Sequence, residues 1–230
     1  MLNEMNVLWI LIFALTPAVS QASPPGSYAS VNIGINLATY PQLEPVPGYP
    51  LYYAPQLQSN YFFYDGQYWI YQDDNWYSSS WYNGPWSLVT PDYVPYFVLR
   101  IPVAYYRQPP TYFAGWQVDA SPRWGEHWGN DWAQRRSGWD RWNRHEVPAA
   151  APLPNYQRKY AGARYPQGEQ QQTLKQHNYH YQPHDPGIGQ QNQRTPAAAP
   201  APAAPQAQPQ RNGAPRAPEH PQEHPPEHPQ

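Results

Sequence analysis

The acidic and basic side chains of this sequence form only one short group that resembles part of a catalytic or metal site. Glu126 and His127 are adjacent, and Asp131 follows His127 by one helical turn. An imidazole and a carboxylate four residues apart lie on one face of a helix, where they can share a metal ion or a proton. They make only half of such a site, and a solvated helix face accounts for the same pair.

Other reactive side chains lack partners. Three consecutive serines at 78–80 have no nucleophile-elbow pattern and no base that the sequence assigns to them. The chain has no cysteine, which excludes disulfides, thiolate metal ligands and cysteine nucleophiles. It also has no glycine loop for phosphate and no paired metal-ligand motif. We therefore predict a protein that is not an enzyme and that needs no cofactor or metal.

Histidines gather towards the C-terminus, where the last residues repeat a Glu-His-Pro unit. Prolines interrupt any helix that would bring these histidines together, so Zn²⁺ or Cu²⁺ would bind only weakly, to histidines on a flexible chain. The histidines in question are His177, His180, His184, His220, His224 and His228.

Aromatic side chains are the most abundant groups that could bind a ligand. The chain has 11 tryptophans and 21 tyrosines, and ten of the tryptophans lie between Trp69 and Trp142. Their rings stack on sugar C–H faces, on bases and on apolar partners, while their polar edges form hydrogen bonds. The elements that carry these rings therefore decide what the chain can bind.

Residues 60–90 have the pattern of an antiparallel β-meander. Two aromatic, β-prone runs, Tyr61–Tyr64 and Tyr68–Tyr71, flank the dipeptide Asp65-Gly66. Such a dipeptide indicates a two-residue hairpin turn in which both residues have positive φ. The rest of the meander is expected as a turn at 73–75, a strand at 76–82, a two-residue turn at Asn83-Gly84 and a strand at 86–89.

Both faces of this meander are predicted to be aromatic. Tyr68 and Ile70 point to one face, and Trp69 and Tyr71 point to the other. An ordinary two-layer sheet has polar residues on its solvent side. Either loops and helices cover both faces, or one face presents its rings to a ligand. In the second case the expected ligand contacts are Trp69, Tyr71, Tyr77 and Trp81.

Shorter elements are expected on either side of the meander. Residues 30–37 alternate between apolar and polar types, which predicts a half-buried strand, and Leu51–Tyr53 suits a short edge strand. Apolar residues at helical spacing predict a short helix at 94–101, ending before a proline. One further strand is expected near Tyr112–Trp116.

The segment from Ser121 to Arg144 is predicted to form a helix with a stripe of tryptophans. Ser121 and Pro122 suit its N-cap and first position. Glycines at 125, 129 and 138 each cost about 1 kcal/mol in a helix interior, so the helix needs a surface to pack on. That surface is either the meander or a membrane, with tryptophans at the headgroup level. The stripe consists of Trp124, Trp128, Trp132, Trp139 and Trp142.

The two ends of the chain differ from this central region. Val7–Ala18 is an apolar run of 12 residues, too short to span a membrane but typical of a secretory signal. After residue 147, Leu153, Leu174 and Ile188 are the only aliphatic side chains larger than alanine, too few to offset the entropy of ordering the backbone. We predict a signal peptide at 1–22, a folded domain at 28–146 and a disordered Pro/Gln/Ala/His tail at 148–230.

Charge is small and unevenly distributed. The net charge of −2 gives no whole-chain attraction to nucleic acid. Between Tyr61 and Leu99 all charged residues are aspartates, whereas Arg100 to Arg144 contains seven arginines and no lysine. These arginines either serve internal packing or form a basic face for an acidic polymer.

Several motifs resemble those of the WxxGxW/YxWGxW-type exported proteins of proteobacteria. The motif Trp81–Trp86 reads WYNGPW, and the runs Val46–Pro55 and Tyr61–Tyr71 read VPGYPLYYAP and YFFYDGQYWIY. Residues 123–128 (RWGEHW) resemble a second block of this family. The resemblance covers about residues 30–165 and implies a periplasmic or envelope-associated protein with no catalytic residues. Some relatives are lipoproteins, but this chain lacks the acylated cysteine.

The sequence therefore predicts an α+β protein with a small antiparallel β-meander, a tryptophan-striped C-terminal helix and a long disordered tail. The expected function is a non-catalytic binding or assembly role in the periplasm or outer envelope. Its partner is expected to be a cell-wall or extracellular polysaccharide or an envelope protein, and not nucleic acid. The alternative is a peripheral membrane protein attached through the helix at 123–144.

Overall fold

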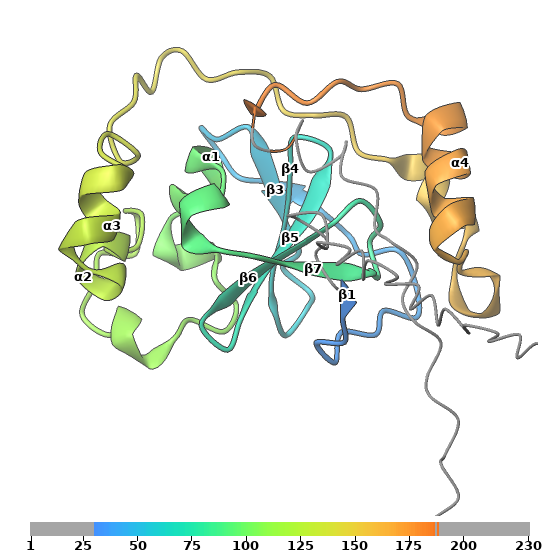
Figure 1. The fold of residues 1–230 in the computed structure, drawn as a ribbon, viewed down its shortest axis with the longest axis horizontal. Coiled ribbons are helices and arrows are strands. Elements are labelled where there is room, and N and C mark those ends of the chain that lie inside the picture. Colours follow the sequence, from blue (N-terminus) through green and yellow to red (C-terminus); the bar gives the residue numbers. More distant parts are fainter. Residues whose placement is uncertain (1–29, 187, 189–230) are drawn as a thin grey trace, which may run out of the picture. The chain divides into compact units, whose positions relative to one another are not determined.

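The computed structural model describes residues 30–186 and 188, and its centre is an antiparallel seven-stranded sheet with the order β1-β7-β6-β5-β4-β3-β2 (Figure 1). The strands are β1 (Ser30–Val31), β2 (Glu44–Pro45), β3 (Leu51–Tyr53), β4 (Asn60–Tyr64), β5 (Gln67–Gln72), β6 (Asn75–Ser79) and β7 (Trp86–Val89). The predicted four-strand meander is confirmed as β4 to β7. The expected strand at 51–53 is β3. It is not the edge strand that was expected, because β2 pairs with its outer side.

Two tight turns set the register of the meander. Asp65 and Gly66 both have positive φ, at 49° and 85°, and Tyr64 pairs with Gln67 across them. Asp73 and Asp74 repeat this geometry in the β5–β6 turn, with φ values of 49° and 64°. Aspartate tolerates this left-handed region better than most residues, so the local sequence favours both turns.

The β6–β7 connection is longer than expected, and the prediction of a two-residue turn at Asn83-Gly84 is wrong. Ser78 pairs with Ser87, and residues 80–85 between the two strands form a loop. Gly84 has a φ of 86°, and a Cβ on it would lie 2.9 Å from the Trp86 ring. The glycine therefore serves a close approach between the loop and this ring.

Short helices complete the described chain. The predicted helix at 94–101 is confirmed in shortened form as α1 (Tyr96–Leu99). The strand expected near residues 112–116 is instead the 3₁₀ helix η3 (Thr111–Phe113), which points Phe113 into the core. The other helices are α2 (Trp124–Trp128), α3 (Asn130–Arg135), α4 (Gly168–Asn178) and the 3₁₀ helices η1 (Pro91–Tyr93), η2 (Val103–Tyr105), η4 (Asn155–Lys159) and η5 (Gly162–Arg164).

The single helix predicted from Ser121 to Arg144 is wrong. Two short helices, α2 and α3, meet at Gly129, which has a φ of 86° and a ψ of 172°. A side chain would strain this backbone conformation, and helix α2 ends there. At Gly125 an added Cβ would lie 3.3 Å from the Cβ of Ala133, so this glycine lets α2 and α3 approach closely. Of the glycines expected to weaken a long helix, Gly129 is thus the one that divides it.

One face of the sheet, which we call the first face, packs against α1, α2, α3 and the segment between α1 and α2 (Figure 1). The cross-strand pair Phe62 and Trp69 and the pair Tyr71 and Trp76 lie at its centre. Each of these four rings is at most 2% exposed. The buried sheet residues of the first face are Leu51, Phe62, Tyr64, Trp69, Tyr71, Trp76 and Val89.

The opposite, second face is covered by chain from both sides of the meander. Ile33, Ile35 and Leu37 pack on it, as their alternating pattern predicts, although only Ser30 and Val31 of the expected strand at 30–37 join the sheet. Helix α4 and the residues that precede it lie on this side as well (Figure 1). The sheet residues of the second face include Tyr61, Phe63, Tyr68, Ile70 and Trp86.

The prediction that the folded domain ends at 146 and that disorder begins at 148 is wrong for the described part of that tail. Gln157 is fully buried: its Oε1 accepts hydrogen bonds from the Tyr68 hydroxyl (3.1 Å) and the Tyr82 backbone (3.2 Å). Its Nε2 donates to the Ser80 carbonyl (2.9 Å). Tyrosines and buried amides, together with Ala151 and Leu153, attach this segment to the second face.

Other predictions fall beyond the described residues. The signal peptide at 1–22 and the tail from 189 onwards lie outside them. Within residues 30–186 and 188, no helix is long and apolar enough to cross a membrane.

Candidate functional site

The predicted aromatic ligand contacts are mostly buried. Trp69 and Trp81 are fully buried and Tyr71 is 2% exposed, while Tyr77 is half-buried. The first-face layer covers Trp69 and Tyr71, and the segment after residue 150 covers Trp81. Of the two alternatives for the aromatic faces, the structure therefore has the covered one, and these four side chains do not form an open ring platform.

The five tryptophans of the predicted stripe pack on the domain, the first of the two surfaces considered for them. Trp124, Trp132 and Trp139 are buried in the first-face core. Trp128 is partly buried and stacks on Trp124, with ring centroids 4.4 Å apart. Trp142 is also partly buried, and its ring centroid lies 5.2 Å from that of Phe97. Three of the five could enter a lipid headgroup layer only if this core opened.

Two arginines of the basic segment also point inward. The Arg100 guanidinium donates to the backbone carbonyls of Trp139 and Arg141, the latter at 3.2 Å. Arg136 donates to the carbonyls of Asp92 (2.7 Å) and Val94. Burial lowers the pKa of both guanidinium groups. These two arginines serve internal packing and are unavailable to an acidic polymer.

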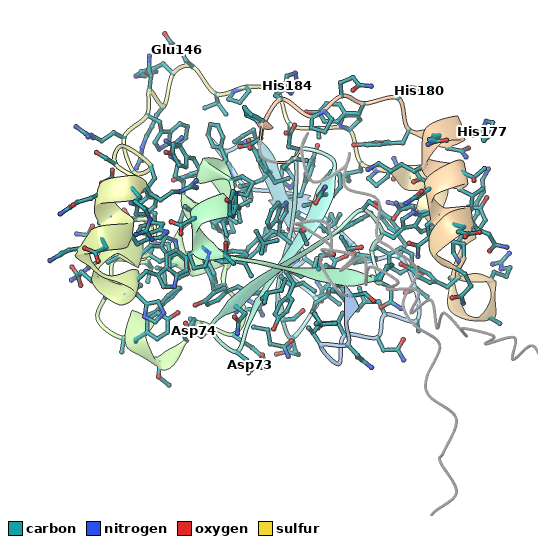
Figure 2. All side chains as sticks on the ribbon, viewed as in Figure 1. Asp73, Asp74, Glu146, His177, His180 and His184 are labelled. Carbon is teal, nitrogen blue, oxygen red and sulfur yellow. The ribbon has the colours of Figure 1, made fainter. Side chains whose placement is uncertain are left out.

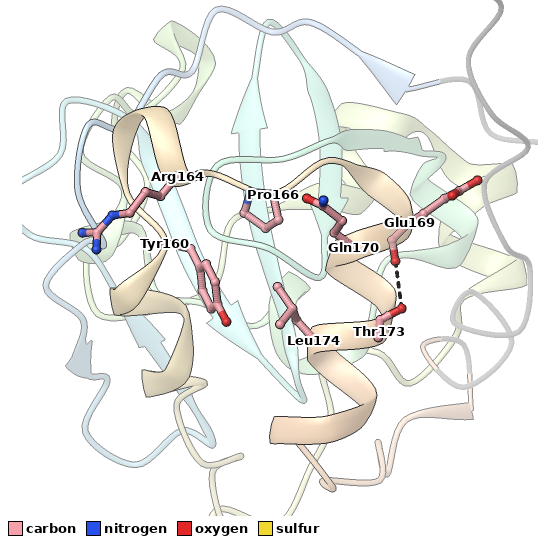
Figure 3. A pocket seen from close by; sticks show the side chains of 7 residues that line it. All are labelled: Tyr160, Arg164, Pro166, Glu169, Gln170, Thr173 and Leu174. Carbon is pink, nitrogen blue, oxygen red and sulfur yellow. Dashed lines mark hydrogen bonds between the residues drawn. The ribbon is translucent and has the colours of Figure 1, made fainter.

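An open groove lies on the outer side of the segment that covers the second face (Figure 3). It has a volume of about 550 Å³, within the range of small-ligand sites. Pro166 connects its two walls, one carrying Tyr160 and the other formed by α4. The lining residues are Tyr160, Arg164, Pro166, Glu169, Gln170, Thr173 and Leu174.

The groove rests on the buried Trp81. Its indole Nε1 donates to the Gln171 carbonyl of α4 at 3.2 Å, and its ring packs edge-on against Tyr160 at 5.7 Å. Gln171 is buried, and its Nε2 donates to the carbonyls of Gly84 and Pro166, both at 3.1 Å. Trp81, predicted as a ligand contact, therefore supports the groove from below instead of lining it.

The groove combines an apolar base with polar edges. Tyr160 and Leu174 are half-buried and offer ring and methyl surface, whereas Arg164, Glu169, Gln170 and Thr173 are exposed. The sequence hypothesis missed this site because the groove lies in the segment assigned to the tail. Its tyrosine content was the signal that could have indicated folding.

A second group of polar side chains lies at the opposite side of the sheet, around Asp74. Tyr71, Tyr112 and His127 donate hydrogen bonds to one oxygen of the Asp74 carboxylate. Burial raises the pKa of this carboxyl, but the three hydrogen bonds outweigh it and leave the pKa below its ordinary value. Burial and the bond to Asp74 raise the pKa of the Tyr71 phenol.

The side chains considered for chemistry are arranged differently from the expectation. His127 pairs with Asp74 at 2.7 Å rather than with Asp131, its predicted helical neighbour. His177, His180 and His184 are spread along α4 and the chain after it (Figure 2). Among the described residues, no three side chains of histidine, aspartate or glutamate gather as metal ligands.

The fold and the groove define an α+β domain built on one antiparallel sheet. Its surface carries a groove with polar edges and with a tyrosine ring and a leucine side chain at its base. Comparison with protein-family models, curated proteins and solved structures finds no match. The function must therefore be argued from the chemistry of the sites.

Proposed function

We propose that the protein is an exported, non-catalytic binding protein of the cell envelope, and that its groove between Tyr160 and α4 binds a polysaccharide of the cell wall or extracellular matrix. The observation that carries this proposal is the groove itself: a tyrosine ring and a leucine side chain below, with guanidinium, carboxylate, amide and hydroxyl groups around them. Sugar rings present C–H faces to aromatic rings and hydroxyls to such polar groups.

The composition of the groove supports binding over hydrolysis. Glycoside hydrolysis requires, in most enzymes, two carboxylates that flank the bond to be cleaved. Glu169 is the only carboxylate among the seven residues that line the groove. The apolar run at residues 7–18 supports export, which would bring the groove into contact with envelope glycans.

The proposal predicts that the purified full chain binds envelope polysaccharide through the exposed edges of the groove. In a sedimentation assay with insoluble peptidoglycan, and in titrations with soluble extracellular polysaccharide, the double variant Arg164→Ala/Glu169→Ala should bind at least about fivefold more weakly. Two lost hydrogen-bonding groups, each contributing about 0.5–1.5 kcal/mol, account for this change.

The matched control is Arg107→Ala/Glu146→Ala, which removes one exposed guanidinium and one exposed carboxylate away from the groove. The control should bind as the unmodified chain does. If the unmodified chain binds neither peptidoglycan nor extracellular polysaccharide, the glycan proposal is contradicted. Equal binding by both double variants contradicts the assignment of the groove.

A further inference from the structure

Four side-chain donor atoms converge at the surface around Asp74. Oδ1 of Asp74 lies 2.6 Å from the Tyr71 hydroxyl, 2.9 Å from the Tyr112 hydroxyl and 2.7 Å from Nε2 of His127. The two hydroxyls also contact each other. Two phenol oxygens and one imidazole nitrogen thus gather within 2.9 Å of one carboxylate oxygen.

Hydrogen bonding alone explains this convergence poorly. All three donors approach the same oxygen, Oδ1, although a carboxylate oxygen offers only about two lone-pair positions. The contact between the two phenols places two further electron-rich atoms together. A cation bound beside Oδ1 would turn each of these four atoms into a ligand.

The hydrophobic core holds the four proposed ligand side chains in place. Tyr112 stacks on the His127 ring, with centroids 4.0 Å apart and planes 6° from parallel. Tyr71 belongs to β5 and packs edge-on against the buried Trp124 at 5.2 Å. Trp124 begins α2, the helix that carries His127. A sheet strand, a hairpin turn and two helices therefore fix the four donors before any ion binds, as a specific metal site requires.

The donor types indicate which ion suits the site. Phenolate and carboxylate oxygens are hard ligands, and imidazole binds zinc, copper, iron and nickel. When a bound ion displaces the protons of both phenols to water, the four ligand side chains carry three negative charges, which match a trivalent cation. No change of oxidation state is involved.

We propose that the surface between the β5–β6 turn and α2 is a ferric iron site formed by four ligands: Tyr71, Asp74, Tyr112 and His127. The Asp74 side chain is 55% exposed and that of His127 is 20% exposed, which gives an ion a path from solvent. Figure 2 shows Asp74 at the tip of its hairpin, beside the segment that leads into α2. The site is separate from the groove, so either proposal can fail without the other.

The test is a titration of the metal-free full chain with ferric citrate at neutral pH. One iron per chain should remain bound after gel filtration, with a visible phenolate-to-iron charge-transfer band that ferric citrate alone lacks. Tyr71→Phe and Tyr112→Phe each remove one hydroxyl and keep the ring. Each should weaken iron binding by at least about tenfold and reduce the band, as loss of a supporting group already does in metal sites.

Tyr106→Phe is the matched control, because its ring lies 6.4 Å from that of Tyr71 and its buried hydroxyl has no hydrogen-bond partner among the described residues. It should bind iron as the unmodified chain does. Near-ultraviolet circular dichroism checks that every variant is folded. Three outcomes overturn the proposal: no retained iron, retained iron without the band, or unchanged binding by both ligand variants. Retention of Zn²⁺ in place of Fe³⁺, independent of both phenols, also overturns it.

Discussion

At the scale of single residues, the two aspartates that open the hairpin turns have the same backbone and different tasks. Asp65 and Asp73 both have a φ of 49°. The Asp65 carboxylate is buried and accepts hydrogen bonds from the Tyr181 hydroxyl (2.6 Å) and the backbone N–H groups of His184 (3.0 Å) and Asp185 (2.7 Å). It therefore joins the meander to a segment more than a hundred residues later.

We expect Asp65→Asn to lower the free energy of unfolding by about 1–3 kcal/mol, because hydrogen bonds to a charged acceptor contribute about 1.5–3 kcal/mol. Asparagine tolerates the same positive φ, but its NH₂ group cannot accept from a backbone N–H. Urea unfolding followed by tryptophan fluorescence measures the change.

The control for this substitution is Asp73→Asn, which makes the same chemical change at the same turn position. Asp73 is exposed, and its carboxylate accepts from the Gln72 side chain at 3.2 Å, while its backbone carbonyl accepts from Asn75 at 2.6 Å. Its replacement should change the free energy of unfolding by no more than about 0.5 kcal/mol, as is usual at the surface. Equal losses of unfolding free energy in the two variants would mean that the turn conformation, and not the link to residues 181–185, determines the loss of stability.

At the scale of elements, the chain after residue 147 completes the second layer of the domain. Tyr165 donates to the Gly84 carbonyl at 2.6 Å, and Tyr179 and Tyr181 pack against Gly66, where an added Cβ would lie 3.3 Å from the Tyr181 ring. Ile188 belongs to the first-face core, so the segment passes the β4–β5 turn from one face to the other. Tyrosine side chains thus supply most of the packing of a segment that has few aliphatic residues.

A chain that ends at residue 147 should therefore be at least about 3 kcal/mol less stable than the full chain, because each large side chain that loses burial costs about 1.5–3 kcal/mol. Its tryptophan emission should shift to the red as Trp81 and Trp86 meet water. A chain that ends at residue 199 is the control and should match the full chain. Coincident urea transitions for the two truncations would show that residues 148–188 contribute no stability.

At the scale of the whole molecule, the core is built from tyrosines whose ionisation opposes folding. Burial raises the pKa of Tyr61 and Tyr68 well above the ordinary value, and it raises the pKa of Tyr156 to about 12. In the unfolded chain these phenols ionise near pH 10. Their contribution to stability is complete below about pH 10 and is lost as the pH rises from there through the folded-state pKa.

We therefore expect alkaline unfolding to coincide with ionisation of the buried tyrosines. Ultraviolet absorbance of tyrosinate should show an early reversible phase near pH 10 from exposed residues such as Tyr93, followed by a steep second phase. Tryptophan fluorescence should report unfolding in that second phase only. A single broad titration of all tyrosines around pH 10, with the fold intact, would contradict this prediction.

Local sequence signals predicted the central part of the fold and failed at its borders. Asp65-Gly66 predicted its hairpin correctly because the sign of φ is a property of the residues in the turn. Gly129 divides the predicted long helix for the same kind of local reason, although the tryptophan spacing concealed it. The tail was misjudged because aliphatic content was used as the measure of apolar surface, while Gln157, Tyr165 and Gln171 make the contacts.

The sequence by itself determined the α+β class, the antiparallel meander and the aromatic nature of both sheet faces, because alternation and turn type depend on neighbouring residues. Only the tertiary structure decided that both faces are covered, that a groove lies beside α4 and that Asp74 meets His127, 53 positions away. Contacts between distant residues depend on how layers pack, and packing is not encoded in any short pattern.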